Sequence, residues 1–210
     1  MGSDETGHIV DALRAGKPVL LPTDGVYGLC AYAYREAPAR RLYELKGRGE
    51  QQPTALIAAS VELLLECVPE LRGRAAVIAR ALLPGPYTLV LPNPAKRFCW
   101  LTGDRPETIG VRVAELAPSA QRVLDAVGAV AATSANEPGE PPAASLDEVP
   151  ERIRAGCAAL LDGGRLSGEP STVIDFTGPE PVVIRQGAGD AETAVARVRS
   201  ALAARLSVPG

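Results

Sequence analysis

Short apolar runs alternate with helical apolar patterns along the whole chain. Runs bounded by Gly, Pro or polar residues predict strands, and apolar positions three or four residues apart predict helices. The predicted strands are 18–22, 26–34, 55–59, 87–91, 108–113, 129–132, 158–162, 172–176 and 181–185. The predicted helices are 36–45, 61–68, 72–83, 119–127 and 191–206. Two further helices are predicted, one that ends near residue 15 and one that begins at residue 150. Helices and strands interleave without an internal repeat or a long linker, which predicts one α/β domain over residues 1–210 with a largely buried mixed sheet.

Polar islands interrupt the apolar runs near the predicted strand ends, where open α/β sheets usually display ligand-binding groups. The islands read PTDGVYGL (22–29), KGRG (46–49), LPGPYTLVL (83–91), TIGVRV (108–113), TSAN (133–136), and GEPSTVID (168–175) together with VIRQG (183–187). We interpret 83–91 as structural, a rigid turn that leads into a core strand. The other islands are candidates for a binding site.

The first of these islands offers a hydroxyl in Thr23, a carboxylate in Asp24 that could hold a cation or an amine, and glycines that allow close backbone approach. An ordinary hairpin turn at Asp24 and Gly25 explains the same pattern. In TSAN, hydroxyls and an amide both donate and accept hydrogen bonds but are poor bases, so this island indicates binding more than proton transfer. Turn formation and capping remain equally good explanations.

Cations mark two more islands. Lys46 and Arg48, flanked by glycines, could reach a polyphosphate, or could complement the negative end of the preceding helix. They belong to a cluster with Arg35, Arg40 and Arg41, a pattern that is also typical of a solvated helix face. Arg112 interrupts an apolar strand, and a buried arginine needs an anion, which could be an internal carboxylate or a substrate carboxylate.

Composition narrows the chemistry. The chain has 210 residues, 46% of them hydrophobic, and a formal charge of −3, so net charge gives no general argument for nucleic-acid binding. His8 is the only histidine, which argues against Ser/His/Asp and Cys/His devices and leaves carboxylates and carbonyls as metal ligands. No apolar run is long enough to cross a bilayer and no signal sequence is visible, so we expect a cytoplasmic protein without membrane contact. The four cysteines have no zinc-site spacing, which favours reduced thiols: Cys30, Cys67, Cys99 and Cys157.

Taken together, the motifs PTDGVYGL, KGRG, PGPYTLVL, TIGVRV, TSAN, PSTVID and VIRQG resemble, in this order and over nearly the whole chain, the YrdC-like family of threonylcarbamoyl-AMP synthases. The resemblance implies a single three-layer α/β domain, with a twisted mixed sheet flanked by helices around a concave basic cleft. It also implies synthesis of threonylcarbamoyl-AMP and pyrophosphate from L-threonine, bicarbonate and ATP. That product serves the modification of tRNA at adenosine 37.

The resemblance also assigns residues. Catalytic roles fall on Lys46 and Arg48. Threonine and bicarbonate would be held by Thr23, Arg112, Ser134 and Ser171, with Arg112 on the threonine carboxylate. ATP would be approached by Arg48, Gln52, Thr108, Asn136 and Arg185. Mg²⁺ would accompany ATP, held by substrate oxygens and water without a protein ligand. Partners implied are tRNA or double-stranded RNA and the downstream tRNA threonylcarbamoyl-transferase proteins.

Some positions depart from the family pattern, and they cluster around the expected amino-acid pocket. A second threonine of the first motif is Gly25 here, a position usually histidine-like is Ile57, and Gln52, Glu137 and Pro138 also differ. Two alternatives therefore stay open. One is a paralogue that binds nucleotide, double-stranded RNA or tRNA without this activity, and the other is carbamoyl-adenylate chemistry on a different amine.

Overall fold

The computed structural model describes residues 2–206. Seven α-helices occur in this range, at α1 (Gly2–Arg14), α2 (Glu36–Lys46), α3 (Val61–Cys67), α4 (Arg74–Leu82), α5 (Pro118–Val127), α6 (Glu151–Gly156) and α7 (Ala191–Leu206). Two 3-10 helices are η1 (Cys99–Leu101) and η2 (Leu146–Glu148). The nine strands are β1 (Val19–Pro22), β2 (Tyr27–Tyr32), β3 (Ala55–Ala58), β4 (Tyr87–Pro92), β5 (Thr108–Arg112), β6 (Ala129–Ser134), β7 (Ala159–Leu160), β8 (Thr172–Asp175) and β9 (Val182–Arg185).

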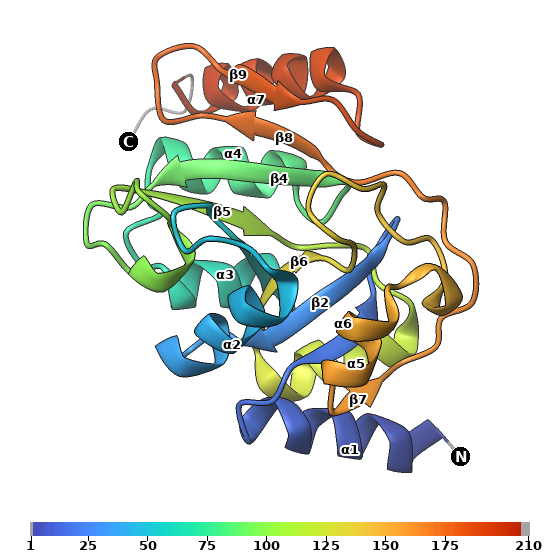
Figure 1. Ribbon diagram of the computed structural model, residues 1–210. Coiled ribbons are helices and arrows are strands. Elements are labelled where there is room, and N and C mark those ends of the chain that lie inside the picture. The colour runs from blue at the N-terminus through green and yellow to red at the C-terminus, as the bar shows by residue number, and fades with distance from the viewer. Residues whose placement is uncertain (1, 207–210) are drawn as a thin grey trace.

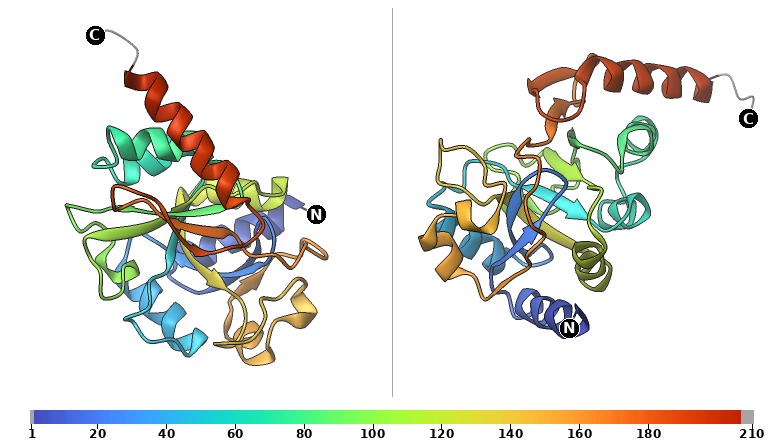
Figure 2. Two further views of the ribbon diagram at one scale, coloured as in Figure 1. Left: turned by 90° about the horizontal axis from the view of Figure 1, so that it is seen from above. Right: turned by 90° about the vertical axis from the view of Figure 1, so that its right-hand side faces the viewer.

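All nine strands form one mixed sheet in the order β7-β1-β2-β6-β3-β5-β4-β8-β9. The pairs β1–β7, β3–β5 and β4–β8 are parallel, and the other neighbours are antiparallel. Figures 1 and 2 show α1 at the β7 end of the sheet and α7 at the β9 end. The predicted α/β class and mixed sheet are confirmed.

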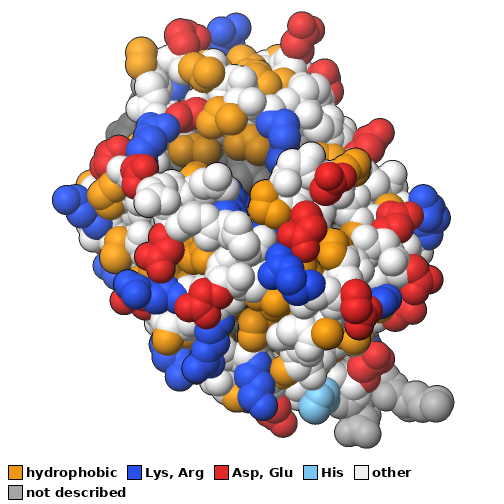
Figure 3. Space-filling model, in the orientation of Figure 1, with side chains coloured by type: hydrophobic (Ala, Val, Ile, Leu, Met, Phe, Trp, Pro, Cys, Tyr) orange, Lys and Arg blue, Asp and Glu red, His pale blue; other side chains and the backbone are white. Residues whose placement is uncertain are grey.

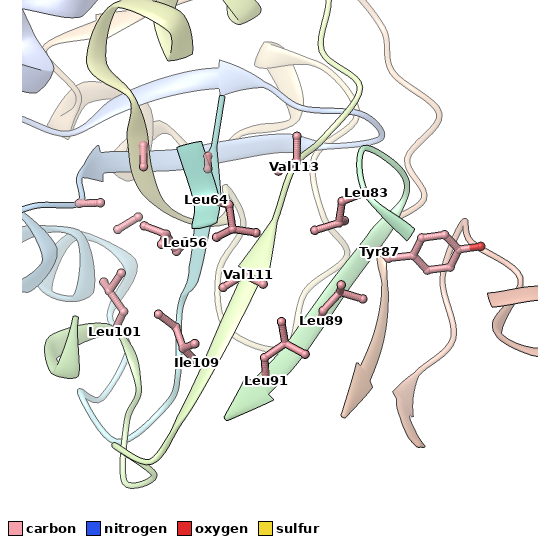
Figure 4. Close-up of a cluster of buried hydrophobic side chains, with 14 of the residues drawn as sticks. Leu56, Leu64, Leu83, Tyr87, Leu89, Leu91, Leu101, Ile109, Val111 and Val113 are labelled. Carbon is pink, nitrogen blue, oxygen red and sulfur yellow. The ribbon is translucent and has the colours of Figure 1, made fainter. Parts of the chain in front are cut away.

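One face of the sheet forms the larger core. Because side chains alternate along a strand, residues that pair across the strands share a face. Leu56, Leu89 and Val111 come from β3, β4 and β5 and point to the same side, as Figure 4 shows, and all three are fully buried. Helices α2, α3, α4 and α7 supply the opposing apolar residues, among them Leu42, Leu64, Ile78, Leu82 and Val198.

On the other face of the sheet, helices cover one end and leave the rest open. Over β1, β2 and β6, apolar residues of α1 and α5, including Leu13 and Leu124, pack against Leu21, Cys30 and Val130. Over β3, β5, β4 and β8, the same face lines a cavity. At this end of the sheet, the cavity therefore takes the place of the third layer that the family resemblance implies.

Most predicted elements appear within one or two residues of their expected limits. The clearest difference is the strand expected over 158–162, which is reduced to the two residues of β7 because only Val19 and Leu20 of β1 pair with it. The Asp24–Gly25 turn does join an antiparallel hairpin of β1 and β2. No helix in the described range 2–206 is long and apolar enough to span a membrane.

Candidate functional site

A cavity of about 560 Å³ lies on the open part of the sheet face. Its size is typical of a small-molecule site. Figure 3 shows the surface hollowed on this side of the molecule, with Lys and Arg side chains beside the hollow. The lining comes from seven strands and the loops next to them, so segments from residue 23 to residue 185 meet there.

The floor of the cavity consists of alternating strand residues. Thr108, Gly110 and Arg112 of β5 all face the cavity, whereas Ile109 and Val111 between them face the core. Small residues keep the centre of the floor low: Ala55 lies beside Gly110, and Ala132 also lines the cavity. The strand period thus separates polar ligand-facing positions from the apolar core.

Four arginines line this cavity, together with one carboxylate, that of Asp104. They come from different parts of the fold: Arg48, Arg105, Arg112 and Arg185. Arg105 lies 3.4 Å from Asp175 and 3.7 Å from Glu107, so its charge is already balanced. The excess of positive charge favours an anionic ligand with several oxygens, since guanidinium groups bind phosphate and carboxylate oxygens in a planar fork.

Arg112 has an internal partner. Its Nη2 donates a hydrogen bond of 2.6 Å to Asp24 Oδ1, and both side chains are largely buried, with 10% and 14% exposed. Arg112 Nε and Asp24 Oδ2 are buried without hydrogen-bond partners. The two interpretations of Arg112 are therefore compatible, because Asp24 takes part of the guanidinium while hydrogen-bonding capacity remains on a residue that lines the cavity.

Ser171 and Arg185 form a second polar group in the cavity. Arg185 Nη2 donates 2.7 Å to the carbonyl oxygen of Ser171, and the Ser171 hydroxyl lies 2.7 Å from Thr88 Oγ1. Burial, and then the nearby Arg112 guanidinium, lower the pKa of Arg185. An anion bound between these two arginines would be stabilised by both.

Arg48 is held at the cavity wall by three acceptors. It donates to Gln52 Oε1 at 2.7 Å, to Pro53 O at 2.9 Å and to Thr133 Oγ1 at 3.1 Å. Burial lowers its pKa. Gln52 is exposed and does not line the cavity, whereas its neighbour Gln51 does. The structure thus places Gln52 behind Arg48, as a group that orients the guanidinium.

Lys46 and Asn136 lie beside the cavity and not on its wall. Lys46 is 4% exposed, and its Nζ donates 2.7 Å to Ser134 O and 2.7 Å to Asn136 Oδ1, with a third bond to Asn136 O. Asn136 Nδ2 in turn donates to Glu140 O. This geometry differs from the expected contact of Lys46 with phosphate or carboxylate, because the ammonium fastens the loop that follows β6.

The remaining expected hydroxyls do line the cavity. Thr23 donates 2.6 Å to Val26 O, and Thr108 donates 3.1 Å to Arg105 O. These internal bonds leave each hydroxyl oxygen able to accept a further hydrogen bond. Ser134 ends β6 at the rim, and its carbonyl oxygen is the Lys46 acceptor.

The cation cluster of residues 35–48 separates into two groups. Arg35, Arg40 and Arg41 are exposed on the outer side, where Arg40 pairs with Glu36 at 2.7 Å and Arg41 donates to Gly16 O at 2.9 Å. Only Arg48 reaches the cavity. The sequence pattern could not separate them, since the division follows from how α2 packs against β2.

Three departures from the family pattern, Glu137, Gly25 and Ile57, can be placed relative to the cavity. Glu137 pairs with Arg152 of α6 at 2.9 Å, and Arg152 also donates 2.7 Å to Leu45 O, so the loop after β6 is tied to α2 and α6. Gly25 does not line the cavity, whereas Ile57 does. The change at Gly25 therefore does not simply enlarge the pocket.

Sequence reasoning missed several lining residues. Thr88 and Val90 alternate with core leucines on β4, a period that could have identified them. Asp104 and Arg105 lie in the irregular loop before β5, where no pattern marks them. In the range 2–206 no group of three Asp, Glu, His or Cys side chains is arranged to hold a metal ion.

Comparisons with known proteins give the family. The family model Sua5_yciO_yrdC, described as "Telomere recombination", matches residues 11–187. Threonylcarbamoyl-AMP synthase of Vibrio campbellii is 34% identical over 185 residues, which cover 86% of this chain and 97% of that protein. Threonylcarbamoyl-AMP synthase of Pyrococcus abyssi is 36% identical over 176 residues, which cover 83% of this chain but only 52% of that longer protein.

A solved structure agrees with these matches. The crystal structure of P. abyssi Sua5 complexed with L-threonine superposes with a TM-score of 0.84 at 33% identity, over 94% of this chain and 58% of that one. The matched family model extends over most of the chain, from α1 through the last strand of the sheet. The chain belongs to the Sua5/YciO/YrdC family.

Proposed function

We propose that this protein is an L-threonylcarbamoyladenylate synthase, which makes threonylcarbamoyl-AMP and pyrophosphate from L-threonine, bicarbonate and ATP for modification of tRNA at adenosine 37. The relatives named threonylcarbamoyl-AMP synthase and the threonine complex of a family member support the reaction and its substrates L-threonine and ATP. The observation that carries the proposal to this chain is the arginine-lined cavity, in which Arg48, Arg112 and Arg185 surround space for anions.

The chemistry suits such a site. The threonine amine attacks the carbon of bicarbonate, water leaves, and a carbamate forms. A carbamate oxygen then attacks the α-phosphorus of ATP, and pyrophosphate departs. Each step brings negatively charged groups together, so positioning and charge stabilisation contribute more than a strong side-chain base.

Roles follow from position in the cavity. Arg112, with hydrogen-bonding capacity beyond its Asp24 contact, would bind the threonine carboxylate, near Ser171 and Ser134. Arg48 follows α2, donates a hydrogen bond to Thr133, and would bind phosphate oxygens. Thr23 and Thr108 offer hydroxyl acceptors to the substrates. Lys46 and Asn136 would act indirectly by holding the loop after β6.

Mg²⁺ belongs to this proposal as a companion of ATP. The donor set fits that arrangement, since the lining residues include several guanidinium groups and a single carboxylate, Asp104. Phosphate oxygens and water would therefore supply most of the coordination. A cytoplasmic location is part of the same proposal, because a tRNA-directed adenylate would be used by transferases in that compartment.

The proposal is tested with purified protein, ATP, Mg²⁺, bicarbonate and L-threonine, by measuring pyrophosphate release. Release should require every component, and omission of threonine should abolish it. Release that is equal with and without threonine would contradict the proposal. Parallel reactions with other amino acids test the alternative amine that Ile57 on the cavity wall leaves open.

A second candidate function is RNA binding. It would use the three exposed arginines that lie away from the cavity. Arg35, Arg40 and Arg41 are all exposed, although Arg40 pairs with Glu36. Binding to tRNA should weaken steeply with salt if these arginines contact phosphates. The triple substitution of Arg35, Arg40 and Arg41 by Ala should then abolish tRNA binding and leave pyrophosphate release intact.

A further inference from the structure

Two glycines enclose the backbone segment that forms one wall of the cavity. This wall segment is residues 169–171, which lead into β8, and its Pro170 and Ser171 line the cavity. Gly25 approaches it from the β1–β2 turn, and Gly187 approaches it from the residues after β9. Segments more than 140 residues apart in the sequence therefore meet at this wall.

The contact with Gly25 is close enough to exclude any side chain. A Cβ at residue 25 would lie 2.0 Å from the carbonyl oxygen of Glu169. The Gly25 carbonyl oxygen also accepts a hydrogen bond of 2.8 Å from the amide of Gly168. Because the opposing atom is backbone, it cannot swing away as a flexible side chain would.

The contact with Gly187 repeats this arrangement on the other side. A Cβ at residue 187 would lie 2.1 Å from Pro170 O and 2.7 Å from the carbonyl carbon of Ser171. The amide of Ala188 donates 2.9 Å to Pro170 O. Neither Gly25 nor Gly187 has a positive φ, so it is close approach, and not backbone conformation, that requires a glycine at both positions.

The wall segment carries polar groups of the site. Ser171 O is the acceptor of Arg185 Nη2, and the Ser171 hydroxyl contacts Thr88 Oγ1. A shift of the segment would therefore move Ser171 and the Arg185 guanidinium together. Arg112 stands near Arg185, so the shift would also change the space between these two cations.

We propose that Gly25 and Gly187 are positioning residues for the amino-acid side of the site. By allowing two backbone contacts, they hold the wall segment, and with it Ser171 and Arg185, at the separation from Arg112 that the substrate requires. At residue 25, where the family resemblance implies a threonine, this chain thus has a backbone contact in place of a side chain. The effect on substrate rests on the proposed function, whereas the effect on the wall does not.

The test compares Gly25→Ala and Gly187→Ala with two control variants. In Gly178→Ala the nearest atom to the new methyl group is 3.5 Å away, an ordinary contact, so nothing should change. In Gly110→Ala the methyl group enters the cavity floor with its nearest neighbour at 3.9 Å, so it fills space without moving the wall.

The first measurement is amide hydrogen exchange of the proteins without substrates. The two reporters are the amides of Gly168 and Ala188, whose acceptors are Gly25 O and Pro170 O. Either wall variant should speed exchange at both reporters by about tenfold or more, while amides of β4 and β5 stay protected. Unchanged exchange would overturn the proposal. So would a loss of protection throughout the sheet, which would make the glycines general stability residues.

The second measurement is steady-state kinetics of pyrophosphate release. A displacement of about 1 Å can cost on the order of 100-fold in catalysis. Because Ser171 is expected to contact threonine, part of this loss should be weaker binding, seen as a rise in the KM for threonine of at least about tenfold. The KM for ATP should rise less than the KM for threonine, because Arg48 lies away from the wall and Arg185 is the only group expected to approach ATP that the wall segment holds. Gly110→Ala should raise the KM for threonine without faster exchange. Equal rises in both KM values would contradict a role on the amino-acid side.

The two measurements separate the two proposals. If the wild type shows no threonine-dependent activity while the wall variants exchange faster, the proposed function fails and the clamping of the wall stands. If the wild type is active but the variants behave like Gly178→Ala in both measurements, the positioning role fails and the proposed function stands.

Discussion

Arg112 Nη2 on β5 lies 2.6 Å from Oδ1 of Asp24 in the β1–β2 turn, 88 residues away in the sequence. The contact joins the β1–β2 turn to the end of β5. Asp24 Oδ2 and Arg112 Nε remain buried and without partners, so the pair balances charge but leaves hydrogen-bonding capacity unused. In an enzyme that binds an amino acid, such a pair offers an arginine that is oriented before the substrate arrives.

Removing either member of this pair should destabilise the fold. Asp24→Ala and Arg112→Ala should each lower the free energy of unfolding by about 3 kcal/mol, since the remaining buried charge loses its partner. The double variant should lose less than the sum of the two. Urea unfolding measures all three. Strict additivity would show that the contact carries no coupling energy.

Arg112 should also be required for threonine. Arg112→Ala, assayed at a temperature where circular dichroism shows it folded, should lose about 2–5 kcal/mol of threonine binding, which removes measurable turnover. The Asp24→Ala and Arg112→Ala double variant should be equally inactive, because it also lacks the guanidinium. Titration calorimetry with threonine checks the binding, and affinity equal to wild type would refute this role.

Arg48 should act on the nucleotide. Arg48→Ala should lose activity and weaken ATP binding by about 2 kcal/mol or more, because a charge-assisted contact is removed. Arg40→Ala is the matched control, since Arg40 lies on α2 but pairs with Glu36 on the exposed side. Fluorescent nucleotide titration compares the two variants. A wild-type ATP affinity in Arg48→Ala would show that the phosphates bind elsewhere.

The contribution of Lys46 to stability should depend on pH. Burial, and then the nearby Arg48 guanidinium, lower the pKa of Lys46 from 10.5 to about 8. Between pH 8 and pH 10.5 the unfolded chain keeps a proton that the folded protein has released, so stability at this site rises with pH across that window. The difference in unfolding free energy between wild type and Lys46→Met should therefore be constant below pH 8. Above pH 8 the wild type should become more stable relative to the variant.

Urea unfolding of both proteins at pH 7, 8, 9 and 10 measures this difference. Lys46→Met serves as the control for the wild type, because it lacks the titrating amine and retains every other titratable group. A difference that does not change with pH up to 10 would mean that the Lys46 ammonium keeps its ordinary pKa, held by its oxygen acceptors Ser134 O and Asn136 Oδ1.

The fold was largely predictable because each strand carries a local signal. Alternation on β4 and β5 and the apolar runs of β1 and β2 locate the sheet, and glycine or proline marks most boundaries. The predicted limits of a strand were wrong where pairing with a neighbouring strand decides how far it extends. Thus β6 extends to Ser134 because Ser134 pairs with Gly28, a contact that no local pattern reveals.

The site was predictable as a set of polar residues but not as a geometry. Thr23, Arg112 and Ser171 were expected to meet, and all three line one cavity. Neither the burial of Lys46 nor the backbone contact at Gly25 could be predicted, because each depends on a loop that reaches its neighbour only after the sheet has formed. Such contacts join residues far apart in sequence and have no period.

The central claim is most directly tested by mass spectrometry of a reaction that contains ¹³C-bicarbonate, ATP, Mg²⁺ and L-threonine. We predict an adenylate whose mass contains threonine, AMP and one ¹³C-labelled carbonyl, formed by the wild type and not by Arg112→Ala. An unlabelled adenylate, or a labelled one that forms equally well without threonine, would contradict the assignment of this protein as a threonylcarbamoyl-AMP synthase.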